Sequence, residues 1–236
     1  MTWSIIARDG SGALGIAIAS RFFAVGALTL HIRSGIGAVS TQALCNPMYG
    51  ARVLDSLAAG ATPRDAVEAA VEPDDGREHR QLHAVAADGA TYARTGASCI
   101  EWCGHFTGEG FSVAGNMLAG PQVIEATAQA WRANGHLEFA ERLVEALAAG
   151  ETAGGDKRGK QAAALRIHTT EDYPALDIRV DDHEEPIAQL RRLCAKSLER
   201  FVPFSQFLPT RANPAGTTDR AVIEAGIEAF HAQRRR

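Results

Sequence analysis

The chain has 236 residues, of which 46% are hydrophobic and 22% are charged, a composition typical of a globular protein at the upper end of single-domain size. The formal net charge of −4 gives no attraction to nucleic acid or to an anionic membrane, so we expect neither as a partner. Four cysteines without a leader segment or membrane span predict reduced thiols and a cytoplasmic location.

The first forty residues predict β-strands. Residues 2–8 form a strand-like run, and Asp9-Gly10-Ser11-Gly12 predicts a hairpin turn after it. Residues 13–19 alternate small and large side chains, so the small face would let another layer approach closely. Leu28, Leu30 and Ile32 predict a third strand, and residues 36–41 a fourth. Four strands before any helix argue against a βαβ fold.

Helices and strands then follow in groups. We expect strands at 81–87, 91–95, 111–116, 161–169 and 176–180, and helices at 47–59, from Thr62 onward, at 123–131, 137–149 and 187–198. This order predicts an α+β fold, a four-layer αββα sandwich of two mainly antiparallel sheets flanked by helices. We assign it residues 1–200. Residues 201–236 predict a C-terminal arm, irregular over 201–214 and helical over 219–230.

Thr2 heads the first strand and is the candidate nucleophile. Threonine is small enough to permit removal of Met1, which would place a hydroxyl and a free α-amine on one residue. An α-amine titrates near pH 7.7–8.0 in model peptides, so it can take the hydroxyl proton at cellular pH. This arrangement suits acyl transfer. The alternative is that Thr2 is simply the first residue of an edge strand.

Six segments resemble signatures of one bacterial family, the domain of unknown function 1028, predicted to be related to N-terminal-nucleophile (Ntn) hydrolases. They are residues 20–27 (SRFFAVGA), 76–81 (GREHRQ), 104–112 (GHFTGEGFS), 115–121 (GNMLAGP), 154–161 (GGDKRGKQ) and 179–183 (RVDDH). The resemblance covers roughly residues 2–195. It implies an αββα sandwich like that of proteasome subunits, with Thr2 at the usual starting position. It does not imply a known reaction.

One departure concerns the catalytic base. Proteasome-like enzymes pair the N-terminal threonine with a lysine about thirty residues on, where this chain has Arg33, and the earlier basic position is Arg21. An arginine can stabilise an oxyanion but cannot shuttle protons, so the α-amine of Thr2 would itself be the base. For both arginines the alternative is a solvated charge at a strand end.

Three further candidates lie near strand ends. Glu78 and His79 could position substrate, or could form a salt-bridged loop that holds the next strand. Asn116 follows a strand, and its amide could donate to an oxyanion or cap a turn. We assign Arg21 and Asn116 to the catalytic site with Thr2, and Glu78, His79, Arg33 and Asp181 to substrate binding.

Cofactor and metal motifs are weak. Asp181, Asp182 and His183 are adjacent in an extended segment, where neighbouring side chains point to opposite sides, so Asp182 is better read as a helix cap. Residues 154–161 resemble a phosphate loop in composition, but a helix precedes them and a strand follows, the reverse of what such a loop needs. We therefore expect no metal and no cofactor.

The resulting hypothesis is an Ntn hydrolase of a small amide or related C–N bond, with a small-molecule substrate. Assembly into a homo-oligomer is expected. The competing hypothesis is a non-catalytic, oligomeric ligand-binding or scaffold protein on the same fold, which arginine in place of lysine favours. A third is a metal-assisted hydrolase that uses Asp181, Asp182 and His183.

Overall fold

The computed structural model describes residues 2–235. Its strands are β1 (Thr2–Arg8), β2 (Leu14–Ser20), β3 (Leu30–Arg33), β4 (Gly37–Ala43), β5 (Arg80–Ala86), β6 (Thr91–Thr95), β7 (Gly104–Gly108), β8 (Phe111–Asn116), β9 (Ala162–His168) and β10 (Leu176–Val180). Its helices are α1 (Gly26–Thr29), α2 (Met48–Ala58), α3 (Pro63–Val71), the 3₁₀ helix η1 (Arg77–His79), α4 (Gln122–Ala133), α5 (Phe139–Thr152), α6 (Pro186–Ser197), α7 (Phe201–Ser205) and α8 (Arg220–Arg234).

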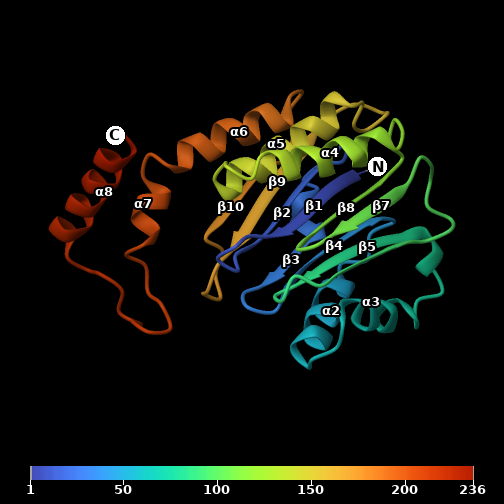
Figure 1. Ribbon diagram of the computed structural model, residues 1–236, viewed down its shortest axis with the longest axis horizontal. Coiled ribbons are helices and arrows are strands. Elements are labelled where there is room, and N and C mark those ends of the chain that lie inside the picture. Colours follow the sequence, from blue (N-terminus) through green and yellow to red (C-terminus); the bar gives the residue numbers. More distant parts are fainter. Residues whose placement is uncertain (1, 236) are drawn as a thin grey trace. The chain divides into compact units, whose positions relative to one another are not determined.

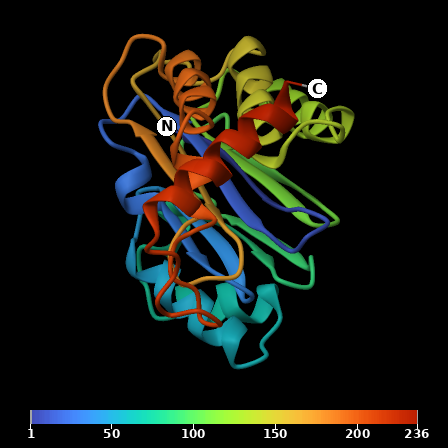
Figure 2. The ribbon, with the colours of Figure 1, turned by 90° about the vertical axis from the view of Figure 1, so that its left-hand side faces the viewer.

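The strands form two antiparallel sheets. Sheet A has the strand order β10-β9-β2-β1-β8-β7, and sheet B has the order β3-β4-β5-β6. Helices α4 and α5 cover the outer face of sheet A, and α2 and α3 cover the outer face of sheet B (Figure 1). The turned view shows the two sheets stacked between these helical layers (Figure 2). The predicted α+β, four-layer αββα sandwich is confirmed.

The alternation in β2 separates two packing surfaces. Ile16 and Ile18 are fully buried and pack with Val85 of sheet B in the core between the sheets. Gly15 lies on the opposite face, where an added Cβ would come within 2.5 Å of Leu143 in α5. The predicted close approach of another layer to the small face is confirmed, and that layer is a helix.

Local turn chemistry also agrees with the sequence. Asp9 Oδ1 accepts hydrogen bonds from the Ser11 and Ala13 backbone N–H groups, both at 2.9 Å, and so closes the β1–β2 hairpin. Thr62 caps α3 by accepting from the backbone N–H of Asp65 at 3.2 Å. These interactions depend only on residues close in sequence, which is why they were predictable.

Two predicted elements were wrong at their starts. Leu28 lies in the short helix α1 and not in the third strand, because Gly26 packs so tightly on β9 that an added Cβ would meet Ala164 at 2.3 Å. Helix α6 begins at Pro186, so Asp182 is not its cap and its first turn contains no acidic residue.

Two short elements were not predicted. Strand β7 has a glycine at each end, which weakens its strand pattern, and its pairing with β8 defines it. Helix α7 interrupts the segment 201–214 that we expected to be irregular.

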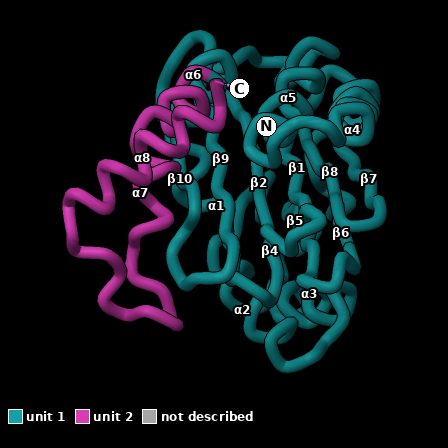
Figure 3. Tube along the Cα trace, turned by 60° about the vertical axis from the view of Figure 1, so that its left-hand side comes forward, with its two compact units in different colours: residues 1–191 teal, residues 192–236 magenta. Residues whose placement is uncertain are grey.

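The chain divides into two compact units, residues 1–191 and residues 192–236, shown in different colours in Figure 3. The predicted boundary at residue 200 remains a prediction of domain organisation. In the second unit, Asp219 caps α8 through the Ala221 N–H at 2.8 Å, and Arg200 pairs with Glu224. None of the described helices is both long enough and apolar enough to span a membrane.

Candidate functional site

The head of β1 places the side chain of Thr2 between the two sheets. Thr2 lies opposite Ser20 in β2 and opposite Asn116 in β8, and residues directly opposite in antiparallel strands share one face. Ser4, two residues on, is on the same face and donates to Gln42 of sheet B at 2.9 Å. The Thr2 hydroxyl therefore points into the interface between the sheets, here called the seam, at one of its ends.

The Thr2 hydroxyl is held within the protein. Its Oγ1 donates a hydrogen bond to Oγ of Ser20 at 3.1 Å, and the two residues are 7% and 2% exposed. A neutral hydroxyl is a weak nucleophile until a base takes its proton, and a serine hydroxyl is not such a base. The bond to Ser20 therefore orients Oγ1 without activating it.

Two backbone carbonyl oxygens determine which way the amide of Gln81 points. Gly115 O and Gly104 O lie 2.8 and 3.1 Å from one terminal atom of this side chain, and a carbonyl can only accept, so that atom is Nε2. Oε1 then accepts from Asn116 Nδ2 at 3.1 Å and from Gln42 Nε2 at 2.8 Å. The Asn116 amide consequently turns its carbonyl oxygen Oδ1 away from Gln81.

The same polarity continues along the seam to His83. Ser4 uses its hydroxyl hydrogen on Gln42 Oε1, so its oxygen must accept from Nε2 of His83, which lies 2.8 Å away. Nδ1 of this neutral ring then accepts from the Ser112 hydroxyl at 3.0 Å. All of these side chains are at most 1% exposed. Such a buried network is held in one arrangement because each donor meets an acceptor.

Burial, with a smaller repulsive contribution from His105, lowers the pKa of His83 to about 3. The unfolded chain binds this proton near the ordinary value of 6.5, so acid favours unfolding. We expect the free energy of unfolding to fall between pH 6.5 and pH 3 by up to about 1.4 kcal/mol per pH unit on account of this group. Urea unfolding across this range should show a weaker pH dependence in His83→Gln, whereas the exposed His79→Gln variant should match wild type. Equal slopes in all three would contradict this assignment.

A cavity of about 300 Å³ opens beside the residues that flank Thr2. Arg21, one of its lining residues, follows Ser20, the hydrogen-bond partner of Thr2. Gln161, another, precedes Ala162, which pairs with Ser20 in sheet A. Thr2 is not itself among the lining residues. The remaining lining side chains are all charged or titratable: Lys160, Asp182, His183 and Glu184.

Two cations of this cavity are held by neighbouring groups. A hydrogen bond from Lys160 Nζ to Glu185 at 2.6 Å, with a further contribution from Glu151, raises the pKa of Lys160. Lys160 is thus protonated at neutral pH and is not a base. The Arg21 guanidinium donates to the backbone carbonyl of Arg158. Both side chains can attract a negative charge, and neither can accept a proton.

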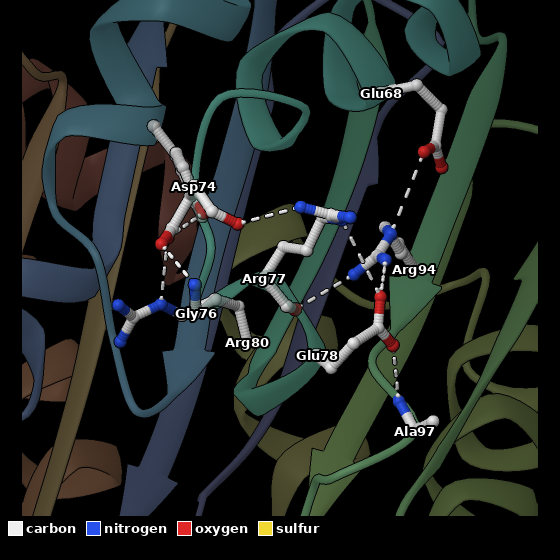
Figure 4. A network of polar contacts seen from close by, with 9 residues as sticks. Glu68, Asp74, Gly76, Arg77, Glu78, Arg80, Arg94 and Ala97 are labelled. Carbon is white, nitrogen blue, oxygen red and sulfur yellow. Dashed lines mark hydrogen bonds and ion pairs between the residues drawn. The ribbon is translucent and has the colours of Figure 1, made fainter.

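Glu78 belongs to an ion-pair network at the same end of sheet B as Gln81 (Figure 4). It accepts from Arg94 Nη2 at 2.6 Å and from the Ala97 backbone N–H at 2.9 Å. The Ala97 N–H, followed by Arg94, lowers the pKa of Glu78. The salt-bridged loop that we considered as the alternative role for Glu78 is therefore present. His79 is exposed, and its backbone carbonyl accepts from the Leu44 N–H at 3.2 Å.

Arg33 and Asp181 are not brought next to Thr2. Arg33 pairs with Gly37 at the start of β4, whereas Gln42, which lies near Thr2, is close to the end of that strand. The Arg33 guanidinium binds Asp55 at 2.8 Å. Asp181 binds Arg179, from Nη2 at 2.7 Å and from Nε at 3.0 Å.

The residues of the metal hypothesis have separate partners. Asp182 accepts from the Gln161 amide at 3.1 Å, and His183 Nδ1 accepts from the Glu185 backbone N–H at 2.8 Å. Among residues 2–235, no group of three or more His, Cys, Asp or Glu side chains is arranged to hold a metal ion. The geometry gives this hypothesis no support.

Sequence reasoning missed the buried polar residues next to Thr2. A signal for them exists in β5, where Gln81 and His83 alternate with Leu82 and Ala84. Polar residues two apart in an otherwise apolar strand share one face, and when that face is buried they must find polar partners. The partners themselves come from other strands, and the sequence alone does not identify them.

Comparison with known proteins identifies one family. A family model described as "Family of unknown function (DUF1028)" matches residues 2–190. Protein SPO2555 from Silicibacter pomeroyi, a crystal structure assigned to the same family, is 31% identical, with a TM-score of 0.87 over 93% of this chain and 96% of that one. No protein of curated function matches the sequence.

Two other solved structures have TM-scores below 0.5. HslV from Trypanosoma brucei has a TM-score of 0.44 and 13% identity, over 72% of this chain and 99% of that one. Anbu, an ancestral beta-subunit from Yersinia bercovieri, has a TM-score of 0.39 and 12% identity, over 83% and 94%. The family model and the 31% identity over almost the whole length show that this chain belongs to the DUF1028 family.

Proposed function

We propose that the protein is an Ntn hydrolase of a small amide or related C–N bond, with Thr2 as the nucleophile after removal of Met1. The observation that carries this proposal is the placement of the Thr2 hydroxyl at one end of the seam, on the same face as Ser20 and Asn116. A cavity of about 300 Å³ adjoins these residues and offers room for a small molecule. Its substrate is accordingly a small molecule.

The chemistry needs no group beyond the residue itself and water. The neutral α-amine of Thr2 takes the proton from Oγ1, and the oxygen attacks the carbonyl carbon of the substrate. The resulting ammonium then donates this proton to the leaving nitrogen as the C–N bond breaks, which leaves an ester on Thr2. Water, deprotonated by the same amine, hydrolyses the ester and restores the hydroxyl.

Two side chains are proposed to stabilise the oxyanion. Asn116 Nδ2 carries two hydrogens and gives one to Gln81, so the second is assigned to the oxyanion. Arg21 supplies positive charge from the adjacent cavity. Glu78 and His79 are assigned to the loop that frames this end of sheet B, and Asp181 to the segment that precedes the cavity residues 182–184. Arg33, at the far end of β4, has no direct part in this scheme.

The second candidate is a ligand-binding protein without catalysis. It is favoured by the state of the cations at the site, because Lys160 is protonated and an arginine cannot serve as a base. On this account the cavity binds its ligand, and Thr2 is a buried polar residue. Assembly into a homo-oligomer and a cytoplasmic location remain predictions under either candidate.

The mechanism requires that Met1 be absent from the mature protein. We expect intact-mass analysis of the purified protein to give the mass of the chain lacking one methionine, because only then does Thr2 carry a free amine. A Thr2→Leu variant is the matched control, since a large second residue blocks removal of the initiator. Full retention of Met1 in the wild-type protein would exclude the self-base mechanism and leave the ligand-binding candidate.

A further inference from the structure

Exposed apolar side chains of the first unit gather at the end of the sandwich that contains Thr2. Among the described residues of this unit, the exposed large hydrophobic side chains are Phe22, Phe23, Leu28, Leu44, Met48, Ile100 and Tyr173. Five of them, each 54–62% exposed, are here called the apolar rim: Phe22, Phe23, Leu28, Leu44 and Ile100. Their loops are connected to Thr2 and to one another by the contacts described next.

Phe22 and Phe23 lie directly beyond the strand end that holds Thr2. They follow Ser20, the last residue of β2, whose hydroxyl accepts the hydrogen bond from Thr2 at 3.1 Å. They are 61% and 62% exposed, although aromatic side chains gain more than most from burial. Two adjacent exposed phenylalanines therefore flank the proposed nucleophile on the β2 side.

Ile100 lies on the other side of Thr2. Its backbone carbonyl accepts a hydrogen bond from the Met117 N–H at 2.9 Å. Met117 follows Asn116, the partner of Thr2 in β8. The side chain of Ile100 is 59% exposed, so an apolar group also flanks Thr2 on the β8 side.

Contacts within sheet B and its loops close the circuit between these two sides. Leu28 O accepts from the thiol of Cys45 at 3.8 Å, which brings Leu28 next to Leu44. The carbonyl of Leu44 accepts from the Arg80 guanidinium, and the carbonyl of Arg80 accepts from the Cys99 thiol at 3.3 Å. Cys99 precedes Ile100. The apolar rim thus encircles the end of the seam.

The opposite end of the sandwich differs. Tyr173 is the one member of the exposed set there, in the connection between β9 and β10, and it is 37% exposed. Met48 begins α2 and lines a separate cavity with Asn46 and Arg52. The concentration of exposed apolar groups around Thr2 is therefore not a general property of the loops.

The size of the rim suits a small ligand better than a second copy of the chain. With 54–62% of five large side chains exposed, it presents roughly 500 Å² of apolar surface. A stable protein interface needs about 800 Å² from each partner, whereas a patch of about 300–600 Å² is often functional in a monomer. The rim also adjoins a cavity lined by charged groups, so the site has an apolar side and a polar side.

We propose that the substrate carries a large apolar group on one side of its scissile amide, held by the apolar rim, and a polar group on the other, held by the cavity of Arg21 and Lys160. This inference rests on the proposed function and specifies its substrate class. An aromatic ring or a medium-length alkyl chain fits the apolar requirement. Burial of such a group against Phe22 and Phe23 supplies binding energy that a short acyl group lacks.

The test measures binding without chemistry. Isothermal titration calorimetry on the Thr2→Ala variant compares N-octanoylglycinamide with N-acetylglycinamide, two probes that differ only in their acyl chain. We expect the octanoyl probe to bind at least about tenfold more tightly, since it adds six methylene groups. The Phe22→Ser/Phe23→Ser double variant should lose this preference, and Phe22→Ala alone should reduce it. Tyr173→Ser, at the opposite end, should keep it.

Equal affinities for the two probes would overturn the proposal. So would a double variant that keeps the preference but changes its sedimentation coefficient, because the rim would then be an interface between copies. The proposed function fails separately: octanoyl preference in Thr2→Ala, without release of octanoate by the wild-type protein, would retain the apolar binding site and exclude the hydrolase.

Discussion

Replacement of Thr2 by alanine should reduce kcat/KM for amide hydrolysis by at least about 10³-fold, because it removes the attacking oxygen and leaves only the binding contribution to catalysis. The amine would remain but would have no hydroxyl to deprotonate. Release of the free amine product from N-octanoylglycinamide, followed with a primary-amine reagent, measures the effect. The variant should fold, since alanine at 7% exposure loses only the bond to Ser20.

Thr2→Ser is the matched control for this loss. Serine keeps both the hydroxyl and the α-amine, so this variant should retain activity within about tenfold of wild type. Wild-type activity in Thr2→Ala would show that another residue attacks the substrate and would contradict the mechanism.

Replacement of Gln81 by leucine should lower the free energy of unfolding by about 3–5 kcal/mol, one of the larger effects of a single substitution. Leucine is of similar size but cannot donate to Gly115 O or accept from Asn116 and Gln42. These groups are buried, and each one left without a partner costs about 1–3 kcal/mol. Urea unfolding followed by circular dichroism gives the difference directly.

Gln122→Leu is the control for the change of residue type. Gln122 is an exposed glutamine whose amide donates to the Ala153 carbonyl at 3.2 Å. Its replacement should change stability by less than about 1 kcal/mol, because water can take over the lost hydrogen bond. Equal effects at both positions would show that the seam network does not stabilise the fold.

The predictable parts of the fold depend on local or periodic information. The alternation in β2 predicted two faces, and the structure places Ile18 against sheet B and Gly15 against α5. The cap at Thr62 was predictable because its partner Asp65 is three residues away. Leu28 misled because its alternation with Leu30 was apolar without being extended, and the tight contact of Gly26 with β9 is not visible in sequence.

The site was only partly predictable for the same reason. Thr2 and Asn116 were nominated separately, and their pairing in adjacent strands followed only from the strand order of sheet A. Gln81 was not nominated, since its role comes from Gly104, Gly115 and Asn116, which lie well beyond it in the chain. Polar networks assembled from several strands need the three-dimensional register before any partner can be assigned.

The most direct measurement of the central claim is covalent capture of Thr2. An alkyl β-lactone, which opens when an activated hydroxyl attacks its carbonyl, is incubated with the wild-type protein, and the adduct is located by peptide mass spectrometry. Our account predicts a single acyl group on the Thr2 side chain of a chain that lacks Met1, and its absence from Thr2→Ala. An unmodified amino-terminal peptide, with the acyl group on another residue or on none, would contradict it.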